Sequence, residues 1–581
     1  MKPSTFIGST GFRRGLVISV FVVFASVLGW RAMDLQLTNK EFLQDRGDAR
    51  YLRTEKTAAH RGMITDRNGE PLAISTPVHS VSGEPRLMLK HLEQWPLIAE
   101  ILGTTTAHLE TLILPRADRE FVYLKRHISP DMARALKDAK LAGVNLLEEQ
   151  RRYYPAAEVT AHILGFTNVD DQGQEGVELA YDETLRGKQG STKVIKDRLG
   201  RVIEFVEQIE PTVAGRNLSL SIDKRIQYIA YRELKAAVQA HKAEAGSMVV
   251  LNPNTGEVLA LVNQPSFNPN NRGNLKGENY RNRAVTDIFE PGSTLKPITI
   301  AAALESGHYQ PDTTIDTSPG YFEVGRHVVS DTNNYGELDV AGVITRSSNV
   351  GASKIALSLE PEYLWKILNG VGFGISSGSR LPGESTGRLG PARNWRDIEH
   401  ATLAFGYGIS VNIMQLARAY SVLAADGMLR PLSITKLEAA LPGQRALSID
   451  TARKVKKMME RVTTIGTGRS AAVAGYHVAG KTGTVHKSTS RGYAEDRYLS
   501  LFAGMLPASR PELVAVVLID EPQSGEHYGG TVAAPIFAKV MQEAARILGL
   551  TPDVQDDVDD NRYRYRIAGR ENLNGSPGVL Q

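Results

Sequence analysis

The sequence predicts an α+β fold, in which an antiparallel sheet flanked by helices follows an N-terminal module and one membrane-spanning helix. An apolar run from Gly15 to Trp30 predicts the spanning helix. Residues 35–215 are polar, mixed in charge and rich in turn signals, which is typical of a separate module. From residue 218 onward, hairpin and helical patterns follow one another without the regular order of βαβ units, and this indicates the α+β class.

Composition excludes several classes of protein. The chain has 581 residues, 42% of them hydrophobic and 23% charged, which is ordinary for a globular protein of about two or three domains. A net charge of +4 is small for this length, so the sequence predicts no binding to nucleic acid. The chain has no cysteine, which excludes disulfides, thiol catalysis and zinc–thiolate sites.

The N-terminal apolar run is intermediate in length between the core of a signal peptide and a membrane-spanning helix. A signal-peptide core has about 7–15 apolar residues, and a spanning helix has about 20. The candidate cleavage site Val23-Phe24-Ala25 lies inside the run and not after it, so an uncleaved signal anchor over residues 15–33 is favoured over a cleaved peptide. Basic residues precede the run, and they predict a cytoplasmic tail over residues 1–14 with the chain beyond residue 34 across the membrane.

Residues 35–215 are predicted to form a structural or docking module, since no catalytic set occurs there. Asp66-Arg67-Asn68-Gly69 is a turn candidate between two apolar stretches, which predicts a hairpin. Amphipathic helices are predicted near Pro96–Leu102 and Pro130–Ala139, each with a proline in its first turn. The stretch from Arg61 to Gly69 is rich in charge and turn residues, as a docking or domain-contact surface would be.

The elements of residues 218–548 follow from short periodic patterns. Alternation over residues 218–223 predicts a strand, and Lys224–Ala240 is predicted to be a helix. Residues 248–251 and 258–262, on either side of a turn, predict a β-hairpin. The remaining predicted elements are helices that begin at Ser293 and near Asn349, a helix from Ile413 to Ala425, and strands over residues 477–485, 499–505 and 513–519. After Leu548 the chain turns polar, with an acidic run over residues 553–560, and a disordered tail is predicted over residues 549–581.

Ser293 and Lys296 stand at the start of the most apolar of these predicted helices, which is expected to end at Gly307. Residues three apart share one face of a helix, so the two side chains can meet. A serine hydroxyl needs a base to become a nucleophile, and a lysine can be that base if burial and nearby positive potential lower its pKa. The N-terminus of a helix supplies such potential.

The pattern S-x-x-K is weak evidence by itself, since Ser433 and Lys436 repeat it without an apolar helix after them. The order of motifs is stronger evidence. Ser347-Ser348-Asn349 follows Ser293, and Lys481-Thr482-Gly483-Thr484 follows in turn. S-x-x-K, S-x-N and K-T-G in this order are the signature of penicillin-binding proteins and class A β-lactamases.

Residues 475–482 also match the phosphate-loop pattern G-x-x-x-x-G-K-[ST], so an ATPase is a rival interpretation. Leu513–Ile519 with Asp520-Glu521 resembles the apolar strand and acidic pair of an ATPase. A phosphate loop needs a strand before it and a helix after it, and neither is predicted around this motif. The expected orientation also places the motif across the membrane from ATP.

With its three motifs behind an anchor, the chain resembles a class B penicillin-binding protein over residues 15–548. Arg61–Gly69, Arg152–Pro155 with His162 and Gly165, and Gly176–Glu178 resemble signatures of that family's N-terminal module. Lys196–Ile203 and the Asn282–Ser293 context resemble the division-specific branch, penicillin-binding protein 3. The resemblance implies a penicilloyl-serine transferase fold over residues 218–548 behind an elongated pedestal or dimerisation-type module over residues 35–215.

The resemblance also implies a D,D-transpeptidase of septal peptidoglycan synthesis. Ser293 would attack the penultimate D-Ala carbonyl of a stem pentapeptide, with Lys296 as base. Ser347 would relay protons, and Asn349 would orient Lys296 and the substrate amide, although Asn349 could also be only a helix cap.

The third motif and its neighbours would bind the substrate. Lys481 would supply positive potential for the substrate carboxylate, and Thr482 and Thr484 would donate hydroxyl hydrogen bonds to it along the strand that includes Gly483. Thr482 could instead be only a sheet residue. The N–H groups of Ser293 and Thr484 would form the oxyanion hole. Two further residues are expected in the pocket wall or core: Tyr407 and Tyr498.

The family's partners would be peptidoglycan stem peptides, β-lactams, a membrane glycosyltransferase of the FtsW type, other divisome proteins and the inner membrane, with a periplasmic catalytic domain and with no cofactor, metal or nucleic acid. Two alternatives stay open. A serine β-lactamase needs a deacylating glutamate between the second and third motifs, yet the nearest similar string, Glu571–Asn574, lies in the tail. A non-catalytic wall scaffold predicts that Ser293 is dispensable.

Overall fold

The computed structural model describes residues 10–38, 52–57, 59–196, 202–273, 277–489 and 492–554. The chain forms two compact units that are interleaved in sequence. Unit 1 consists of residues 1–60, 77–150 and 187–215, and unit 2 of residues 61–76, 151–186 and 216–581. The region predicted as one module over residues 35–215 therefore contributes to both units.

The N-terminal helix of unit 1 fits a membrane span. Helix α1 covers Thr10–Met33, and one π-helical turn, Asp34–Thr38, continues it. Gly11–Leu37 has a mean hydropathy of 2.0 and none of the apolar window is buried in the protein. At a rise of 1.5 Å per residue this stretch is about 40 Å long, which exceeds the hydrocarbon core of about 30 Å. The basic residue Lys2 and most of the predicted cytoplasmic tail lie outside the described residues.

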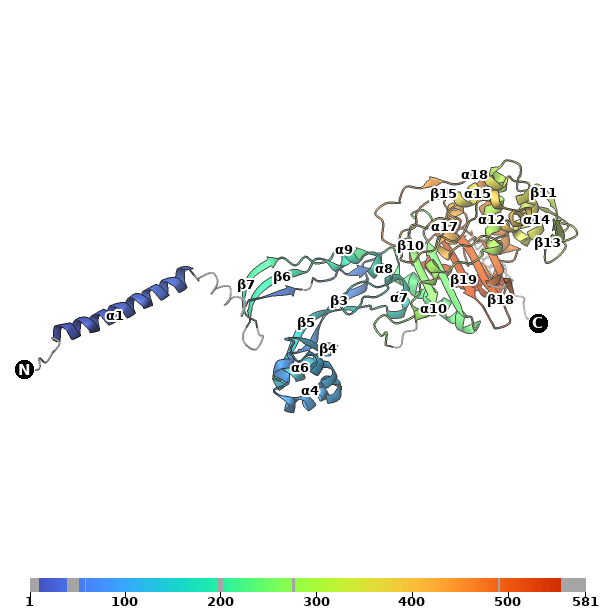
Figure 1. Ribbon diagram of the computed structural model, residues 1–581. Coiled ribbons are helices and arrows are strands. Elements are labelled where there is room, and N and C mark those ends of the chain that lie inside the picture. Colours follow the sequence, from blue (N-terminus) through green and yellow to red (C-terminus); the bar gives the residue numbers. More distant parts are fainter. Residues whose placement is uncertain are drawn as a thin grey trace, which may run out of the picture. The chain divides into compact units, whose positions relative to one another are not determined.

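The rest of unit 1 contains a three-stranded sheet, strands β4 and β5 and part of β3 (Pro71–Gly83) from a five-stranded sheet, and a helical cluster (Figure 1). Strands β1, β6 and β7 form a three-stranded antiparallel sheet. Helices α4 and α6 confirm the two predicted amphipathic helices, and Ser129 caps α6 by accepting from the Met132 N–H. The bounds are β1 Leu52–Thr57, α3 Pro85–Met88, α4 Trp95–Leu102, α5 Thr106–Ile113, β4 Val122–Ile128, α6 Pro130–Ala139, β5 Val144–Tyr153, β6 Gly190–Lys196 and β7 Val202–Glu210.

Unit 2 begins with the predicted hairpin, which is confirmed as β2 (Ile64–Thr65) paired with β3 (Pro71–Gly83). The expected domain-contact role of Arg61–Gly69 is supported, because the Arg67 N–H donates to the Ile222 carbonyl at 2.9 Å and Lys436 Nζ donates to the Arg67 carbonyl at 2.9 Å. The Arg61 end of the stretch is not a surface, since Arg61 is 1% exposed. Arg61 and Arg152 both bind the fully buried Glu178, at 2.7 and 2.6 Å. Removing one partner of such a buried pair costs about 3–5 kcal/mol, so this cluster ties together segments that are far apart in sequence.

The centre of unit 2 is a five-stranded antiparallel sheet in the order β10-β9-β19-β18-β17. This arrangement confirms the α+β class. The predicted hairpin is confirmed as β9 and β10, and two predicted late strands as β18 and β19. The strands are β9 Ala245–Leu251, β10 Val258–Gln264, β17 Ala479–Thr489, β18 Gly492–Leu506 and β19 Leu513–Asp520.

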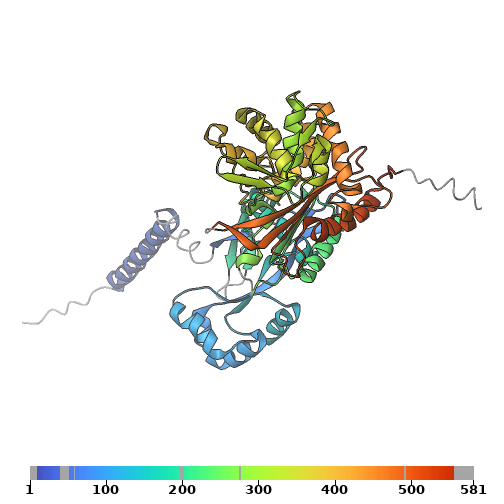
Figure 2. The ribbon, with the colours of Figure 1, turned by 90° about the vertical axis from the view of Figure 1, so that its right-hand side faces the viewer.

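Helices cover both faces of this sheet (Figure 2). On one face α10 and α20 pack over Met248, Val250 and Leu259. On the other face α12, α17 and α18 form the larger core with Val249 and Leu251. Neighbouring residues of β9 thus point to opposite faces, so the strand is apolar throughout, as a strand buried on both sides must be.

The helices of unit 2 were predicted in part. Helix α10 matches its predicted range, whereas the predicted strand over residues 218–223 shortens to β8, Leu218–Ser219, since Asp223 caps α10 by accepting from the Arg225 N–H. The bounds are α7 Ala161–Leu164, α8 Gly176–Ala180, α9 Asp182–Arg186, α10 Lys224–Ala240, α11 Arg283–Thr286, α12 Lys296–Glu305, α13 Val340–Arg346, α14 Asn349–Leu357, α15 Pro361–Gly370, α16 Asp397–Leu403, α17 Ile413–Ala424, α18 Ile449–Thr464, α19 Gly529–Val532 and α20 Ala534–Leu548.

Short strands complete unit 2 near the ends of these helices: β11 Thr314–Asp316, β12 Tyr321–Val324, β13 His327–Ser330, β14 Glu337–Asp339, β15 Met428–Leu429 and β16 Gln444–Arg445. Beyond α20, Gly549 takes the left-handed conformation that ends a helix, and Leu550 accepts a hydrogen bond from the Tyr476 hydroxyl. Residues 555–581 of the predicted disordered tail lie outside the described residues.

Candidate active site

Ser293 lies in a tight 3₁₀ turn, Gly292–Leu295, that leads directly into α12. We call it the Ser293 turn. Gly292 has a φ of +55°, and a Cβ at this position would meet Val485 Cγ2 at 2.3 Å, so only glycine fits here. Ser293 is half-buried and Lys296 is fully buried at the start of the helix. The predicted helix therefore starts as a 3₁₀ turn that leaves the hydroxyl accessible.

Lys296 Nζ is the centre of the site. It lies 3.0 Å from Ser293 Oγ and 2.8 Å from Asn349 Oδ1, and it also contacts the Ser347 carbonyl oxygen. Burial lowers the pKa of Lys296 well below its usual value, and the nearby Lys481 lowers it further, while Asp331 acts in the opposite direction. A neutral amine has two protons and one lone pair. In the neutral form, the two N–H groups can donate to the Ser347 carbonyl oxygen and to Asn349 Oδ1, and the lone pair can accept the proton of the Ser293 hydroxyl.

Ser347 Oγ stands between the two lysines, 3.2 Å from Lys296 Nζ and 2.9 Å from Lys481 Nζ. Its backbone has a φ of +63°, which is strained for a residue with a side chain. The position after α13 therefore holds the hydroxyl where it can pass a proton between the amines. The strain itself is a sign of a functional constraint.

Asn349 is the first residue of α14 and does not cap it. Ser348 is the cap, because its hydroxyl accepts from the Gly351 N–H at 2.9 Å. Asn349 Nδ2 donates to the Ser330 carbonyl at 3.0 Å, which fixes the amide so that Oδ1 faces Lys296. The alternative that Asn349 is only a helix cap is thus wrong.

Lys481 is fully buried in β17, and burial lowers its pKa to about 7. Its Nζ donates to Ser347 Oγ and, at 3.1 Å, to the Thr482 carbonyl. A pKa near 7 means that its charge changes close to neutral pH. An anionic ligand beside Lys481 would favour the charged form.

The strand after Lys481 runs beside the Ser293 turn. A Cβ at Gly483 would lie 3.0 Å from Thr294 Cγ2, so the small residue allows this close approach. The hydroxyls of Thr482 and Thr467 form a hydrogen bond of 2.6 Å, so the Thr482 side chain has a contact besides the pairing of its backbone in the sheet. Thr484 Oγ1 accepts from the Gly529 N–H at 3.1 Å, which leaves its own proton available to a ligand.

Tyr407 and Tyr498 each pack against other aromatic side chains. The Tyr407 ring meets Tyr493 edge-on at 5.4 Å, and burial raises the pKa of Tyr407. The Tyr498 ring stacks on His527 at 4.1 Å, and its hydroxyl donates to the Glu495 carbonyl at 3.0 Å. Neither tyrosine has a hydrogen bond to Ser293 or Lys296 among the described contacts, and a role of the two rings in a pocket wall stays a prediction.

Two residues that the sequence did not single out support this arrangement. Asp331, just after β13, accepts from the Ser348 hydroxyl and from the N–H groups of Asn349 and Val350, so a carboxylate sits at the N-terminus of α14. The Tyr420 hydroxyl of α17 donates to the Thr294 carbonyl at 2.8 Å and so holds the Ser293 turn. A lone Asp in a polar loop and a lone Tyr in a helix carry no motif that would have revealed these roles.

The phosphate-loop match does not form a phosphate loop. Gly480, Lys481 and Thr482 lie within the extended strand β17, and β18 follows it in a hairpin. A phosphate loop wraps its N–H groups around an anion between a strand and a helix. In the described part of residues 475–506 that geometry is replaced by a sheet, which removes the structural basis of the ATPase interpretation.

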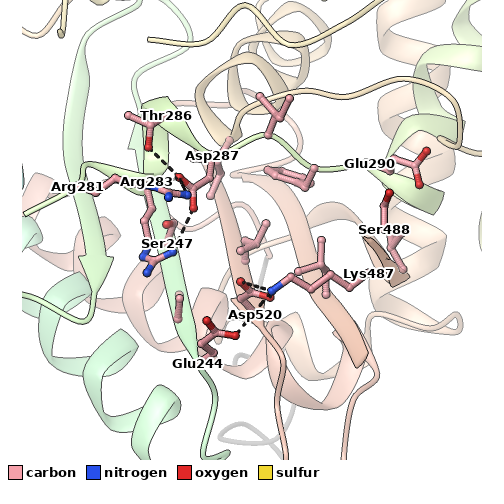
Figure 3. Close-up of a pocket in the computed structure, with 18 of the residues that line it drawn as sticks. Glu244, Ser247, Arg281, Arg283, Thr286, Asp287, Glu290, Lys487, Ser488 and Asp520 are labelled. Atoms are coloured by element: carbon pink, nitrogen blue, oxygen red, sulfur yellow. Dashed lines mark hydrogen bonds and ion pairs between the residues drawn. The ribbon is translucent and has the colours of Figure 1, made fainter. Parts of the chain in front are cut away.

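A cavity of about 540 Å³ lies next to this site, lined in part by Phe289, Glu290 and Val485. Figure 3 shows that charged side chains within it pair with one another. Arg283 pairs with Asp287 at 3.2 Å, and Lys487 with Asp520 at 2.9 Å. Five acidic and three basic side chains line the cavity, so it differs in charge from the lysine-rich centre around Ser293.

A serine hydroxyl held by a lysine of lowered pKa, beside a strand with hydroxyl donors and a second buried lysine, is suited to acyl transfer. The fold and the site together are those of a serine acyltransferase. Two family models match the chain: the penicillin binding protein transpeptidase domain over residues 246–542, and the penicillin-binding protein dimerisation domain over residues 56–220.

Relatives and solved structures agree with these matches. The chain is 42% identical over 550 residues to the peptidoglycan D,D-transpeptidase FtsI of Escherichia coli strain K12, covering 94% of this chain and 93% of that protein. The apo transpeptidase domain of Burkholderia pseudomallei penicillin-binding protein 3 is 44% identical with a TM-score of 0.54, over 58% of this chain and 98% of that one. A Bifidobacterium adolescentis peptidoglycan synthetase shares the fold, with a TM-score of 0.70 and 24% identity over 87% of this chain and 98% of that one. The chain belongs to the penicillin-binding protein family, as a class B protein of the FtsI type.

Proposed function

We propose that the protein is a monofunctional peptidoglycan D,D-transpeptidase that cross-links stem peptides in septal wall synthesis through an acyl-enzyme on Ser293. The observation that supports this most directly is the distance of 3.0 Å between Lys296 Nζ and Ser293 Oγ, with the pKa of Lys296 lowered by burial. Such a pair has both the nucleophile and an amine whose lowered pKa favours its action as a base.

In the first half-reaction, Lys296 takes the proton from Ser293, and Oγ attacks the carbonyl of the penultimate D-Ala. The N–H groups of Ser293 and Thr484 stabilise the resulting oxyanion. The C–N bond then breaks, and the leaving D-Ala nitrogen receives a proton from the Lys296–Ser347–Lys481 chain of hydrogen bonds. The products are free D-Ala and an ester on Ser293.

In the second half-reaction, an amine from a neighbouring stem peptide attacks the ester carbonyl. The Lys296 amine accepts the proton that this amine loses, and Ser293 leaves as the alcohol. The product is a peptide cross-link and free enzyme. Asn349 holds Lys296 in position in both halves, because its Oδ1 lies 2.8 Å from Nζ.

The substrate carboxylate binds near Lys481, Thr482 and Thr484. The lysine supplies charge, and the free proton of the Thr484 hydroxyl supplies a directed hydrogen bond. A bound carboxylate favours the charged form of Lys481, which compensates for the lowering of its pKa to about 7. β-Lactams, which carry a carboxylate next to a strained amide, enter by the same contacts.

The protein acts as a single-pass inner-membrane protein through α1. Its N-terminus lies in the cytoplasm and its catalytic unit in the periplasm. A membrane glycosyltransferase of the FtsW type, together with other divisome proteins, supplies the glycan strands. The basis for this is the apolar helix with basic residues before it, and the kinship with FtsI.

A labelled penicillin tests the proposal. The purified protein should gain the mass of one penicilloyl group on Ser293, and the Ser293→Ala variant should gain none. An adduct that persists in that variant, or that maps to Ser433, would refute the assignment. Rapid loss of the adduct from the wild-type protein would indicate a β-lactamase, and complementation of a depleted strain by Ser293→Ala would indicate a scaffold.

A further inference from the structure

A second large cavity of unit 2, of about 690 Å³, lies among the end of α17, the helix α18 and the connection between β18 and β19. Its lining includes none of the site residues around Ser293. We call it the basic groove, because five cationic side chains line it: Arg430, Arg453, Lys456, Lys457 and Arg510.

The acids that line the basic groove are too few to balance its cations. Only two acids, Asp426 and Glu460, line it beside the five cations. Asp426 pairs with two of the cations: it binds Arg453 at 2.7 Å and lies 3.8 Å from Lys456 Nζ. Burial raises the pKa of Glu460, which weakens its contribution further at acidic pH. The groove therefore has a surplus of positive charge.

Three of the cations form no close ion pair among the described residues, and Lys457 has only a longer-range attraction to Glu460. Arg430, Lys457 and Arg510 form no ion pair there, and Arg430 Nε is buried without a hydrogen-bond partner. A buried donor that is left unpaired is costly, and more so when it is charged. The groove is thus built to receive an acceptor of negative charge that the described residues do not provide.

The described end of the chain lies at the rim of this groove. Asp553 Oδ2 accepts from the Ser509 N–H at 3.2 Å and from the Ser509 hydroxyl at 2.6 Å, and Ser509 is one of the residues that line the groove. Asp553 Oδ1 also accepts from the His477 N–H at 2.7 Å. The chain is therefore fixed at this point when it passes beyond Val554.

The sequence that follows is acidic: residues 555–560 are Gln-Asp-Asp-Val-Asp-Asp, with four carboxylates in five positions from Asp556 to Asp560. An extended chain advances about 3.3–3.6 Å per residue, so residues two to six beyond Val554 reach about 7–20 Å. The acidic residues can therefore lie close to Ser509 and Arg510, which line the groove.

We propose that the basic groove is the docking site of the acidic segment 556–560 of the same chain. The groove has the surplus of cations and the unpaired guanidinium nitrogen, and the segment has the carboxylates and is tethered at Ser509. Tethering gives the segment an effective concentration in the millimolar range for a short linker, so weak individual contacts suffice. Docking between exposed charges is screened by salt.

A competition measurement tests this proposal on the full-length protein. The probe is a fluorescein-labelled peptide with the sequence of residues 554–561, and its anisotropy is titrated at low salt. The tail variant Asp556→Asn/Asp557→Asn/Asp559→Asn/Asp560→Asn has the same length as the wild type and an uncharged segment. We expect this variant to bind the probe about tenfold more tightly than the wild type, whose groove is already occupied.

Groove variants are combined with the tail variant to locate the binding. Lys457→Glu/Arg510→Glu should abolish binding of the probe, and the milder Arg430→Gln should weaken it. The matched control Lys137→Glu/Arg326→Glu changes two exposed cations elsewhere and should bind the probe as the tail variant does. Unchanged reaction with penicillin shows that each variant is folded.

The remaining outcomes would overturn the proposal. Equal binding of the probe to the wild type and the tail variant would mean that the segment does not occupy the groove and that only an external anion does. Absence of binding to both would mean that the groove does not take a carboxylate-rich peptide. Binding that survives Lys457→Glu/Arg510→Glu would place the probe elsewhere.

Discussion

At the scale of single residues, the two lysines of the site have different surroundings and are predicted to have different roles. Lys296 contacts Ser293, and Lys481 contacts Ser347. In the proposed mechanism Lys296 gives and takes a proton, whereas Lys481 contributes charge for the substrate carboxylate. Arginine keeps a positive charge but cannot be deprotonated near neutral pH. We expect Lys296→Arg to slow acylation by penicillin about 10²–10⁴-fold, and Lys481→Arg to have a smaller effect. Stopped-flow measurement of acylation compares them, and equal losses would refute the separate roles.

The pH dependence of acylation follows from the same two residues. As pH falls through the lowered pKa of Lys296, the base becomes protonated and the rate falls. As pH rises above about 7, Lys481 loses its charge and the rate falls again. We expect a bell-shaped profile of the second-order acylation rate constant in the wild type. In Lys481→Arg the alkaline limb should flatten, because arginine stays charged. An unchanged alkaline limb would assign that limb to another group.

The residues that carry a motif could be predicted from the sequence, because chemistry restricts their identity and order. The structure brings Ser293, Lys296, Ser347, Asn349 and Lys481 within hydrogen-bond reach of one another, as expected. Residues that act by position could not be predicted. Glu178 is the partner of Arg61 although 117 residues separate them, and no local pattern marks such a pair.

At the scale of elements, helix α14 and the strand before it position the second motif through Asp331. The carboxylate accepts from the Ser348 hydroxyl and two N–H groups at the start of α14. Asp331→Ala should lower the free energy of unfolding by about 0.5–2 kcal/mol, as loss of a helix cap does. Asp331 also raises the pKa of Lys296, so the acid limb of acylation should move to lower pH in this variant. Chemical denaturation and the pH profile measure the two effects.

A structural loss alone would not move the acid limb, so an unchanged limb in Asp331→Ala would limit Asp331 to capping. Ser129→Ala is a matched control, since it removes a cap in unit 1. It should affect stability by a similar amount and leave the profile of acylation unchanged.

Elements with strong local patterns were predicted well, and those fixed by tertiary contacts were not. Helix α10 has a cap, a clear apolar stripe and matching bounds. The strand expected over residues 218–223 is short because the Ser221 hydroxyl donates to the Val258 carbonyl and Asp223 caps α10. The Ser293 helix begins as a 3₁₀ turn because Val485 and Tyr420 pack against that turn.

At the scale of the whole molecule, chemistry and anchoring are carried by different parts of the chain. Every contact of the candidate site lies in unit 2, and the apolar helix lies at the start of unit 1. We expect a soluble form that begins near residue 35 to react with penicillin at a rate close to that of the full-length protein. Mass spectrometry of the two forms measures this, and a loss of reaction would show that the span is needed for the fold of the site.

The same truncation should abolish wall synthesis in cells, because the proposed lipid-linked substrate and the proposed membrane glycosyltransferase partner would be confined to the plane of the membrane. A freely soluble enzyme loses the effective concentration that confinement gives. Replacing Gly15–Trp30 by an unrelated spanning helix separates tethering from recognition. Full rescue of growth in a depletion strain would mean that the span is only a tether. If the protein with the foreign helix is correctly localised and still acylated on Ser293 but does not restore growth, the native span itself contacts the partner. Normal growth with the soluble form would contradict the need for anchoring.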